Sequence, residues 1–130
     1  MDSNISSSSM RKLSALVVDD DAVIRRIHVA YLQKHGFETR AVENGQLAVD
    51  LIRSGEVFDV IFMDFNMPVM NGIEATKELR DLGVNAMIVG ISDDQDHTME
   101  DFIEAGMDQF YKKPLKAQTI TSVLRVLQGN

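Results

Sequence analysis

The chain has 130 residues, of which 45% are apolar, and this length is typical of one domain with a single core. It contains no cysteine, which excludes disulfides, thiolate metal sites and a cysteine nucleophile. Its formal net charge of -7 disfavours binding to nucleic-acid phosphates or anionic lipid, and no apolar run approaches the roughly 20 residues of a membrane span.

The chain divides into a polar N-terminal segment and one patterned domain. Residues 1–11 are serine-rich and cannot bury apolar surface, so we expect a disordered tail there. Over residues 12–129, short apolar runs alternate with amphipathic stretches. The candidate strands are residues 13–18, 37–42, 57–63, 86–91 and 107–111. Helix-sized segments between them predict an α/β fold, a doubly wound (βα)5 parallel sheet.

The apolar content of the candidate strands predicts their order in the sheet. The first, third and fourth are continuously apolar, as strands covered on both faces are. Glu38, Arg40 and Glu43 interrupt the second strand, and the fifth is short. Because interrupted and short strands suit the edges of a sheet, we predict the order 2-1-3-4-5.

A helix is predicted over residues 21–35, directly after the first strand. Its expected core-facing stripe consists of Ile24, Ile27, His28, Tyr31, Leu32 and His35. Ala22, Arg26 and Val29 project from the opposite face. Two interpretations of that face stay open. Its apolar residues are either the ordinary scatter found on protein surfaces or part of a surface that docks another protein.

Aspartates follow two strands whose carboxyl ends meet at one edge of the predicted sheet. Asp19, Asp20 and Asp21 follow the first strand, and Asp64 ends the third. Ligands of doubly wound sheets bind where the strand order reverses, here between these two strands. Helix capping explains one aspartate but not the whole set. Crowded carboxylates favour a hard cation, so we expect Mg²⁺ and a phosphate-bearing ligand or intermediate.

Two further side chains are expected at the same edge. Ser92 follows the fourth strand and Lys113 the fifth. The serine hydroxyl can donate a hydrogen bond to a phosphoryl oxygen, and the lysine ammonium can offset its charge. Either residue alone would be interpreted as an ordinary solvated loop residue. Their placement at successive strand ends adds them to the predicted site.

The chain resembles the response-regulator receiver domain, the CheY-like family, over roughly residues 12–128. The motifs that carry the resemblance are LVVDDD at residues 16–21, MDFNMPVMNG at 63–72, Ser92, and KKP at 112–114. Receivers have the strand order 2-1-3-4-5, so that order is not independent of the resemblance. In the family the peptide bond matching Lys113-Pro114 is cis.

The resemblance implies a function and a role for each matching residue. Asp64 would accept a phosphoryl group from a phosphohistidine of a histidine kinase or a histidine-containing phosphotransfer protein. Asp19, Asp20, Asp64 and the main-chain carbonyl of Asn66 would bind Mg²⁺. Lys113 would offset charge on the transferring oxygens. The chain would then be a signalling phosphoacceptor that catalyses its own phosphorylation and dephosphorylation, and not an enzyme with a separate substrate.

The resemblance also implies a switch and two positions that tune hydrolysis. Ser92 and Phe110 would form the switch, because a hydroxyl that moves toward the phosphoryl group vacates space for an aromatic ring. Asn66 and Asp94 would flank the hydrolytic water. Both side chains are short and polar, so we expect a phosphoryl lifetime of minutes or less.

The predicted receiver would fill nearly the whole chain, so we expect its output to pass through another protein. We expect a monomer that docks a phosphotransfer protein through its first helix, located in the cytoplasm or also in the nucleus. It resembles small stand-alone plant regulators of type C. The alternative that this chain is a receiver excised from a hybrid kinase stays open.

A pseudo-receiver and a magnesium-dependent phosphohydrolase are two alternative functions for this chain. A pseudo-receiver that binds partners without phosphorylation should have lost Asp20, Asp64 or Lys113, and all three are present. A magnesium-dependent phosphohydrolase of the haloacid-dehalogenase type needs Asp-x-Asp at its nucleophile, whereas this chain has Asp64-Phe65-Asn66. Both alternatives are therefore disfavoured.

Overall fold

The computed structural model describes residues 11–93 and 99–129. Its strands are β1 (Ser14–Val18), β2 (Glu38–Val42), β3 (Val60–Asp64), β4 (Met87–Ser92) and β5 (Gln109–Lys112). All neighbouring strands are parallel, and the order is β2-β1-β3-β4-β5. The predicted fold class and strand order are thus confirmed.

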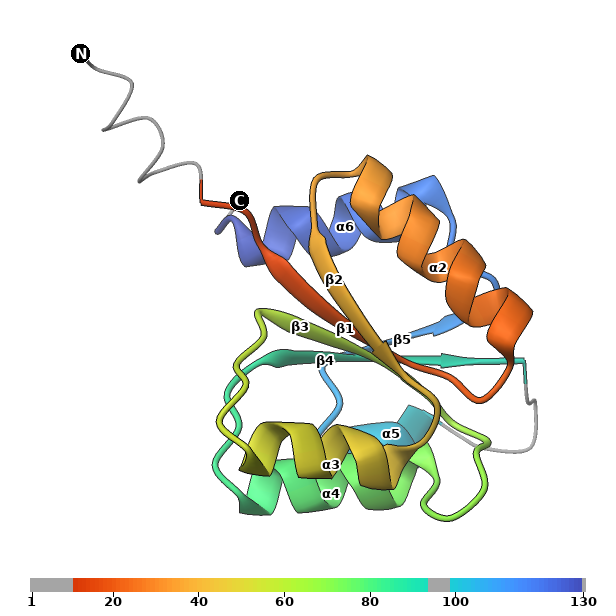
Figure 1. Ribbon diagram of the computed structural model, residues 1–130, viewed down its shortest axis with the longest axis vertical. Helices are drawn as coiled ribbons and strands as arrows, with labels where there is room; N and C mark the ends of the chain where they lie inside the picture. Colours follow the sequence, from red (N-terminus) through yellow and green to blue (C-terminus); the bar gives the residue numbers. More distant parts are fainter. Residues whose placement is uncertain (1–10, 94–98, 130) are drawn as a thin grey trace.

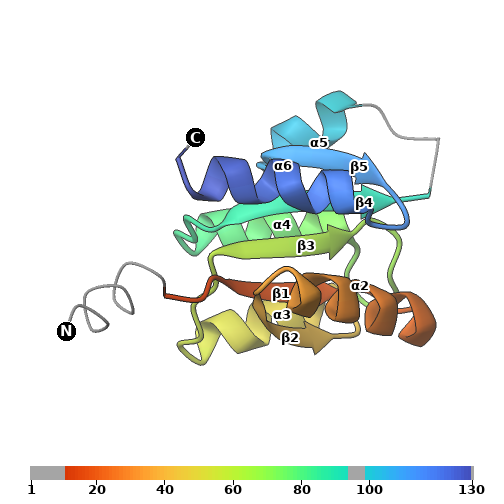
Figure 2. The ribbon, with the colours of Figure 1, turned by 90° about the horizontal axis from the view of Figure 1, so that it is seen from above.

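The helices are α2 (Ala22–Lys34), α3 (Gly45–Arg53), α4 (Gly72–Asp81), α5 (Met99–Ala105) and α6 (Ala117–Leu127). Helices α2 and α6 cover one face of the sheet, and α3, α4 and α5 cover the other (Figures 1 and 2). None of these helices, within the residues described, is both long and apolar enough to cross a membrane.

Two hydrophobic cores result from the alternation of side chains along the central strands. Leu16 and Val18 of β1 belong to the core under α3, α4 and α5. Ala15 and Val17 belong to the core under α2 and α6. Successive side chains of a strand point to opposite faces, so a strand covered on both faces must be apolar throughout. This requirement explains why the unbroken apolar runs lie at the centre of the sheet.

Strand β3 begins later than predicted. It starts at Val60 rather than at residue 57, and Val57 is exposed. The residue before the strand, Asp59, accepts hydrogen bonds from the main-chain N–H of Ser14 at 2.7 Å and from the Arg11 guanidinium at 3.2 Å. The main chain of Asp59 still pairs with Ser14 and Met87, but the Ser14 N–H is taken by the Asp59 carboxylate and is not available to a main-chain carbonyl nearer Val57.

The predicted first helix is α2, with Asp21 as its N-cap and His35 as its C-cap. Within its expected core stripe, His28 and Leu32 are buried. Tyr31, in contrast, is 43% exposed, so the expectation that it packs in the core was wrong. It lines a surface cavity together with Lys34, His35 and residues 114–117.

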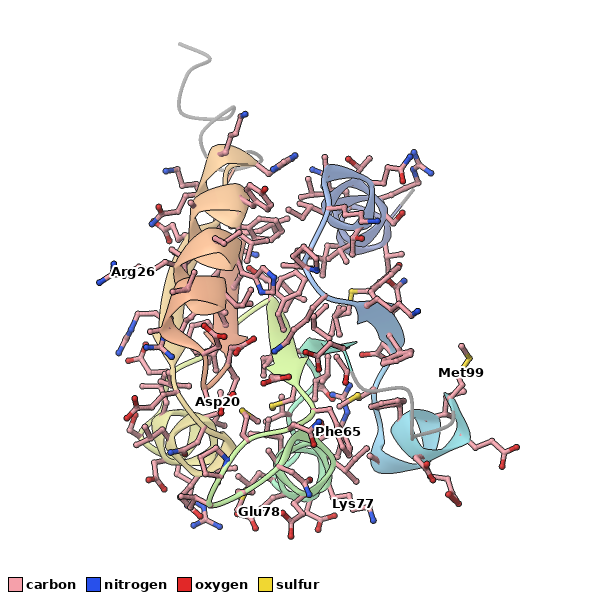
Figure 3. The ribbon with its side chains drawn as sticks, turned by 90° about the vertical axis from the view of Figure 1, so that its right-hand side faces the viewer. Asp20, Arg26, Phe65, Lys77, Glu78 and Met99 are labelled. Atoms are coloured by element: carbon pink, nitrogen blue, oxygen red, sulfur yellow. The ribbon has the colours of Figure 1, made fainter. Side chains whose placement is uncertain are left out.

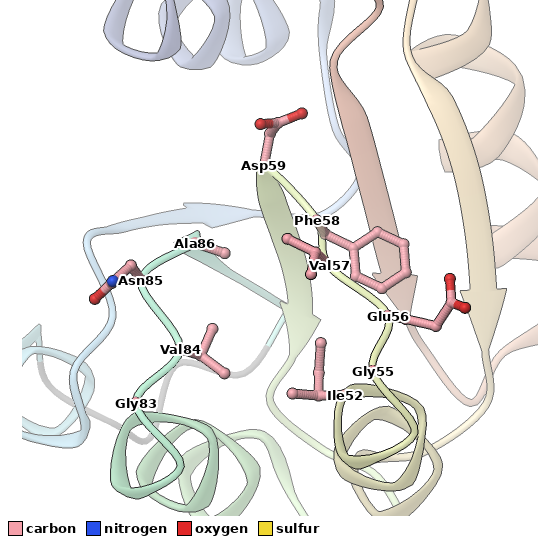
Figure 4. A pocket seen from close by; sticks show the side chains of 10 residues that line it. All are labelled: Ile52, Gly55, Glu56, Val57, Phe58, Asp59, Gly83, Val84, Asn85 and Ala86. Carbon is pink, nitrogen blue, oxygen red and sulfur yellow. The ribbon is translucent and has the colours of Figure 1, made fainter.

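A cavity of about 500 Å³ lies at the amino ends of β3 and β4, away from the predicted site (Figure 4). Its lining includes Phe58, Val84 and Ala86 together with the acidic residues Glu56 and Asp59. Both carboxylates are already engaged, Glu56 with Arg40 and Asp59 with Arg11. The predicted chemistry therefore does not coincide with this cavity.

Candidate functional site

Three of the predicted acidic side chains meet at the carboxyl ends of β1 and β3. These strands are neighbours, with Val18 opposite Met63, so the next residues, Asp19 and Asp64, come together. The side chains of Asp19 and Asp64 are 2% and 3% exposed. Asp20 is exposed beside them, near the amino end of α2 (Figure 3). One carboxylate oxygen from each of the three residues lies within 4.8 Å of the others.

Lys113 joins the two buried carboxylates. Its Nζ lies 3.0 Å from Asp19 Oδ2 and 3.0 Å from Asp64 Oδ1. Its main-chain N–H donates to the carbonyl of Ser92 at 3.1 Å, which extends the β4–β5 pairing beyond the strand. The Lys113-Pro114 peptide bond is cis. One ammonium thus faces two buried negative charges, and the local charge balance stays negative.

Burial and the neighbouring charges in this pocket shift the pKa of Asp64 upward. Burial, followed by the negative charge of Asp19, raises the pKa of Asp64 from 3.8 to about 7, although the ammonium of Lys113 opposes this change. Burial by itself would lower the pKa of Lys113, but the hydrogen bonds and charges of Asp19 and Asp64 outweigh it and raise that pKa. The lysine stays cationic, whereas Asp64 binds a proton easily when no other cation is present.

One oxygen of Asp64 is left over for a ligand. Among the described residues, Asp64 Oδ2 is a buried side-chain oxygen without a hydrogen-bond partner. Buried polar atoms are nearly always satisfied, so an orphaned carboxylate oxygen beside two further carboxylates points to a cation or another electrophilic ligand. The arrangement can therefore hold a hard divalent ion on its open side while Lys113 holds the other side.

The consecutive aspartates divide into different roles. Asp21 caps α2, with its Oδ1 accepting hydrogen bonds from the N–H groups of Val23 at 2.9 Å and Ile24 at 3.1 Å. Asp19 Oδ1 accepts from the main-chain N–H of Asp21 at 2.9 Å, which orients the Asp19 carboxylate. Helix capping therefore explains one aspartate, Asp21, as predicted from the sequence. Asp19 and Asp20 face Asp64.

The remaining predicted site residues lie around this centre. Ser92 is buried at the end of β4, and Asn66 is exposed in the loop between β3 and α4. Phe110 is half-buried in β5. Asp94 lies outside the described residues.

Sequence reasoning missed an aromatic row that connects the centre with Phe110. Phe65, the residue after Asp64, meets Phe102 of α5 edge-on at 5.7 Å between ring centroids. Phe102 in turn stacks on Phe110 at 4.1 Å. The only sequence signal for this row is the position of Phe65 next to Asp64, because the contact with α5 joins residues far apart in the chain.

Of the residues singled out for docking, Ala22 and Arg26 lie on the outer side of α2, whereas Val29 packs against the core under α2 and α6. Ala22 and Arg26 are exposed, and Val29 is half-buried. Arg26 points away from the body of the molecule (Figure 3). Arg26 and Val29 line a shallow surface cavity with Ala30 and Gln33. This helix face borders the carboxyl end of β1 and hence the acidic centre.

Comparison with known families and proteins gives a consistent match. The sequence pattern of the family described as "Response regulator receiver domain" matches residues 15–125. Two-component response regulator 24 of Arabidopsis thaliana is 43% identical over 117 residues, which are 89% of this chain and 84% of that protein. Two-component response regulator ORR42 of Oryza sativa subsp. japonica is 41% identical over 114 residues, covering 87% of this chain and 85% of that protein.

Solved structures agree in fold. The receiver domain of sensor histidine kinase PA1611 from Pseudomonas aeruginosa, solved with a magnesium ion coordinated in its active site cleft, has a TM-score of 0.79 at 26% identity and covers 92% of this chain and 99% of its own. The receiver domain of Ssk1, in a co-crystal with the Saccharomyces cerevisiae histidine phosphotransfer protein Ypd1, has a TM-score of 0.78 at 26% identity, with coverages of 88% and 87%.

The raised pKa of Asp64 predicts a pH-dependent gain in stability on replacing Asp64→Asn in metal-free solution. The unfolded carboxyl ionises near 3.8 and the folded one near 7, so the unfolded state binds fewer protons between these values. Stability contributed by the protonated Asp64 is present below about pH 4 and is lost as the pH rises through 7. Asparagine does not ionise, so the variant does not lose this stability as the pH rises. We expect the substitution to stabilise more at pH 8 than at pH 5, by about 1–3 kcal/mol after discounting for solvent screening.

Urea unfolding with EDTA at both pH values measures this difference. The same substitution at the exposed Asp81 controls for the removal of one negative charge from the surface. An equal effect of Asp64→Asn at pH 5 and pH 8 would contradict the raised pKa.

Proposed function

Because the chain belongs to the response regulator receiver family, we propose that Asp64 accepts a phosphoryl group from a phosphohistidine of a histidine kinase or a histidine-containing phosphotransfer protein. One observation carries this assignment. Asp64 is a buried carboxylate with one oxygen 3.0 Å from the Lys113 ammonium and the other without a partner. The first oxygen is neutralised, and the second is available as a nucleophile or ligand.

The residues present fit a magnesium ion. Asp19, Asp20 and Asp64 offer hard oxygen ligands from one side, and the unpartnered Asp64 oxygen needs a cationic neighbour. Mg²⁺ binds through one or two carboxylates together with phosphate oxygens, and it would neutralise charge on the transferring group. The main-chain carbonyl of Asn66 is proposed as a further ligand. The magnesium ion in the similar receiver domain of PA1611 supports this assignment.

In the proposed reaction, an Asp64 oxygen attacks the phosphorus in line with the leaving imidazole. The new P–O bond forms as the P–N bond to the donor histidine breaks, and the imidazole leaves with the bonding pair. Lys113 offsets charge on the phosphoryl oxygens, and the Ser92 hydroxyl donates to one of them. A cation bound in the pocket would also favour the ionised form of Asp64, whose pKa without one is about 7.

The signal would leave the site through Ser92 and Phe110. In this proposal the serine hydroxyl moves toward the phosphoryl group and the Phe110 ring moves into the space released. The stacking of Phe110 on Phe102 supports a route to α5, because a change in the Phe110 ring must change that contact. The protein would act as a monomer in the cytoplasm or also in the nucleus, and its output would be the protein that reads this surface.

Docking of the phosphodonor is proposed on the outer face of α2, at Ala22, Arg26 and Val29. The exposure of Ala22 and Arg26 beside the acidic centre supports this placement. The complex of Ypd1 with the similar receiver domain of Ssk1 supports a phosphotransfer protein as the partner.

The central prediction concerns Asp64→Asn. Incubation with a phosphohistidine-labelled phosphotransfer protein and Mg²⁺ should label the wild type, and the substitution should reduce labelling to below about 1% because the amide cannot form the acyl phosphate. Asp21→Asn is the matched control, since asparagine still caps α2. It should be labelled like the wild type. Omission of Mg²⁺ should suppress labelling of the wild type and of Asp21→Asn. Label retained by Asp64→Asn would refute the assignment.

The phosphorylated wild type should lose its label within minutes in Mg²⁺. Asn66 is short and exposed, and nothing bulky in that side chain would keep water from the phosphorus. Loss of protein-bound radiolabel after removal of the donor measures this lifetime, and addition of EDTA should prolong it. An acyl phosphate that persists for hours in Mg²⁺ would contradict open access for water.

The docking proposal predicts a specific effect of Arg26→Glu. Reversing a charge at the rim of an interface weakens association, so the half-saturating concentration of the phosphotransfer protein should rise by about threefold to tenfold. The maximal rate should stay unchanged, because Arg26 does not reach the acidic centre. Arg125→Glu on α6 makes the same charge change on another exposed surface and should have no such effect. Equal effects of both substitutions would place the interface elsewhere.

A further inference from the structure

His28 ties α2 to the loop that carries Lys113. Its side chain is buried, although most residues of the outer α2 surface are exposed. Its Nε2 accepts a hydrogen bond from the main-chain N–H of Leu115 at 3.0 Å, across 87 positions of sequence. Leu115 is itself buried in the core under α2 and α6. This hydrogen bond therefore connects the first helix with the segment between β5 and α6.

The hydrogen bond to His28 engages the first main-chain N–H group that follows Lys113 in the sequence. Pro114 has no N–H, so the N–H of Leu115 is the first donor after the lysine. On the other side, the N–H of Lys113 donates to the carbonyl of Ser92. The segment of Lys113, Pro114 and Leu115 is thus held at one end by β4 and at the other end by His28.

This restraint matters because of where the Lys113 ammonium must reach. Strand β5 is at the edge of the sheet, and β4 separates it from β3. Lys113 nevertheless contacts both Asp19 after β1 and Asp64 of β3, each at 3.0 Å. A shift of the segment away from α2 would move the ammonium away from these carboxylates. Displacements of about 1 Å are enough to slow a positioned reaction strongly.

The histidine ring is suited to accept this bond. Burial lowers the pKa of His28 to about 4, with the charge of Asp19 opposing this change and that of Lys113 adding to it. The neutral ring keeps a lone pair on Nε2, and acceptance at that atom places the proton on Nδ1. A lysine at the same position could not accept, and an aliphatic side chain would leave the buried N–H of Leu115 without a partner.

From these contacts we infer that His28 is a positioning residue for phosphotransfer, because its hydrogen bond to Leu115 holds the segment that presents the Lys113 ammonium to Asp64. This inference rests on the proposed function of Asp64, since it assigns His28 a part in that reaction. His28 does not touch the reacting atoms, and it acts only through the segment that follows β5.

The test compares His28→Leu with His28→Gln in the full chain. Leucine fills the space without an acceptor, whereas the Oε1 of glutamine lies at about the reach of Nε2 and can accept the Leu115 N–H. We expect His28→Leu to lower the maximal rate of phosphotransfer from a labelled phosphotransfer protein by about tenfold, with little change in the half-saturating concentration of donor. We expect His28→Gln to stay within about twofold of the wild type.

Two controls separate positioning from loss of stability. Val49→Ala weakens the core on the other face of the sheet, and at a temperature where it stays folded it should phosphorylate like the wild type. The ¹H–¹⁵N signal of Leu115 and the ¹⁵Nζ signal of Lys113, recorded without any phosphodonor, report the hydrogen bond and the ammonium environment. Both signals should change in His28→Leu and be largely restored in His28→Gln.

The outcomes are distinct. Unchanged rate in His28→Leu, or a glutamine variant that restores the Leu115 signal but not the rate, would overturn the positioning role. An equal loss of rate in Val49→Ala would reduce His28 to a general contributor to stability and would also overturn it. A wild type that is never labelled would instead count against the proposed function, while the NMR comparison would still decide whether His28 holds Lys113.

Discussion

The arrangement of the site depends on one lysine that lies between two buried carboxylates. Asp19 and Asp64 are both almost fully removed from water, and the Lys113 ammonium is 3.0 Å from each. Without this cation, two negative charges would share a poorly hydrated pocket at a high cost in free energy. With it, one negative charge remains uncompensated. Burial, together with this remaining negative charge, raises the pKa of Asp64. A second cation that accompanies a phosphoryl group is therefore a favourable occupant of the pocket.

The order of the sheet creates both the pocket and the need for supporting contacts. Because β1 and β3 are neighbours, their carboxyl ends bring Asp19 and Asp64 together without further adjustment. Lys113 follows β5, which β4 separates from β3. The carbonyl of Ser92 and the ring of His28 hold the Lys113 segment from two sides. Precision at the site therefore depends on β4 and α2 as well as on the strands that carry the carboxylates.

Aromatic side chains at the same edge of the sheet also connect the centre with α5, the proposed output surface. Phe65 directly follows Asp64, and it contacts Phe102 of α5, which stacks on Phe110 of β5. A change in the position of Phe110 cannot leave Phe102 unaffected, because their ring centroids are only 4.1 Å apart. This packing gives the proposed switch a physical link to α5, whereas the proposed docking face on α2 lies on the other side of the sheet (Figures 1 and 2). Input and output would thus use different surfaces of one small domain.

Local patterns in the sequence determined the fold and most of the candidate site. Continuous apolar runs identified the central strands, since a strand covered on both faces has no polar position. The aspartates, Ser92 and Lys113 follow the predicted strands in the sequence, so they could be placed at strand ends. The parallel strand order then places the carboxylates at one edge of the sheet. The start of β3 was misplaced, because the Asp59 carboxylate takes the N–H of Ser14, a residue 45 positions away that local patterns do not connect with Asp59.

Only the tertiary structure distinguished residues that look alike in the sequence. Asp19, Asp20 and Asp21 are chemically identical, but the start of α2 turns Asp21 into a cap and leaves the other two facing Asp64. Periodicity placed both Tyr31 and His28 on one core stripe, yet Tyr31 is 43% exposed and His28 accepts a hydrogen bond from Leu115. Periodicity reports which face of a helix is apolar. It contains no information on which distant main-chain group lies opposite, because that partner is set by the packing of the whole domain.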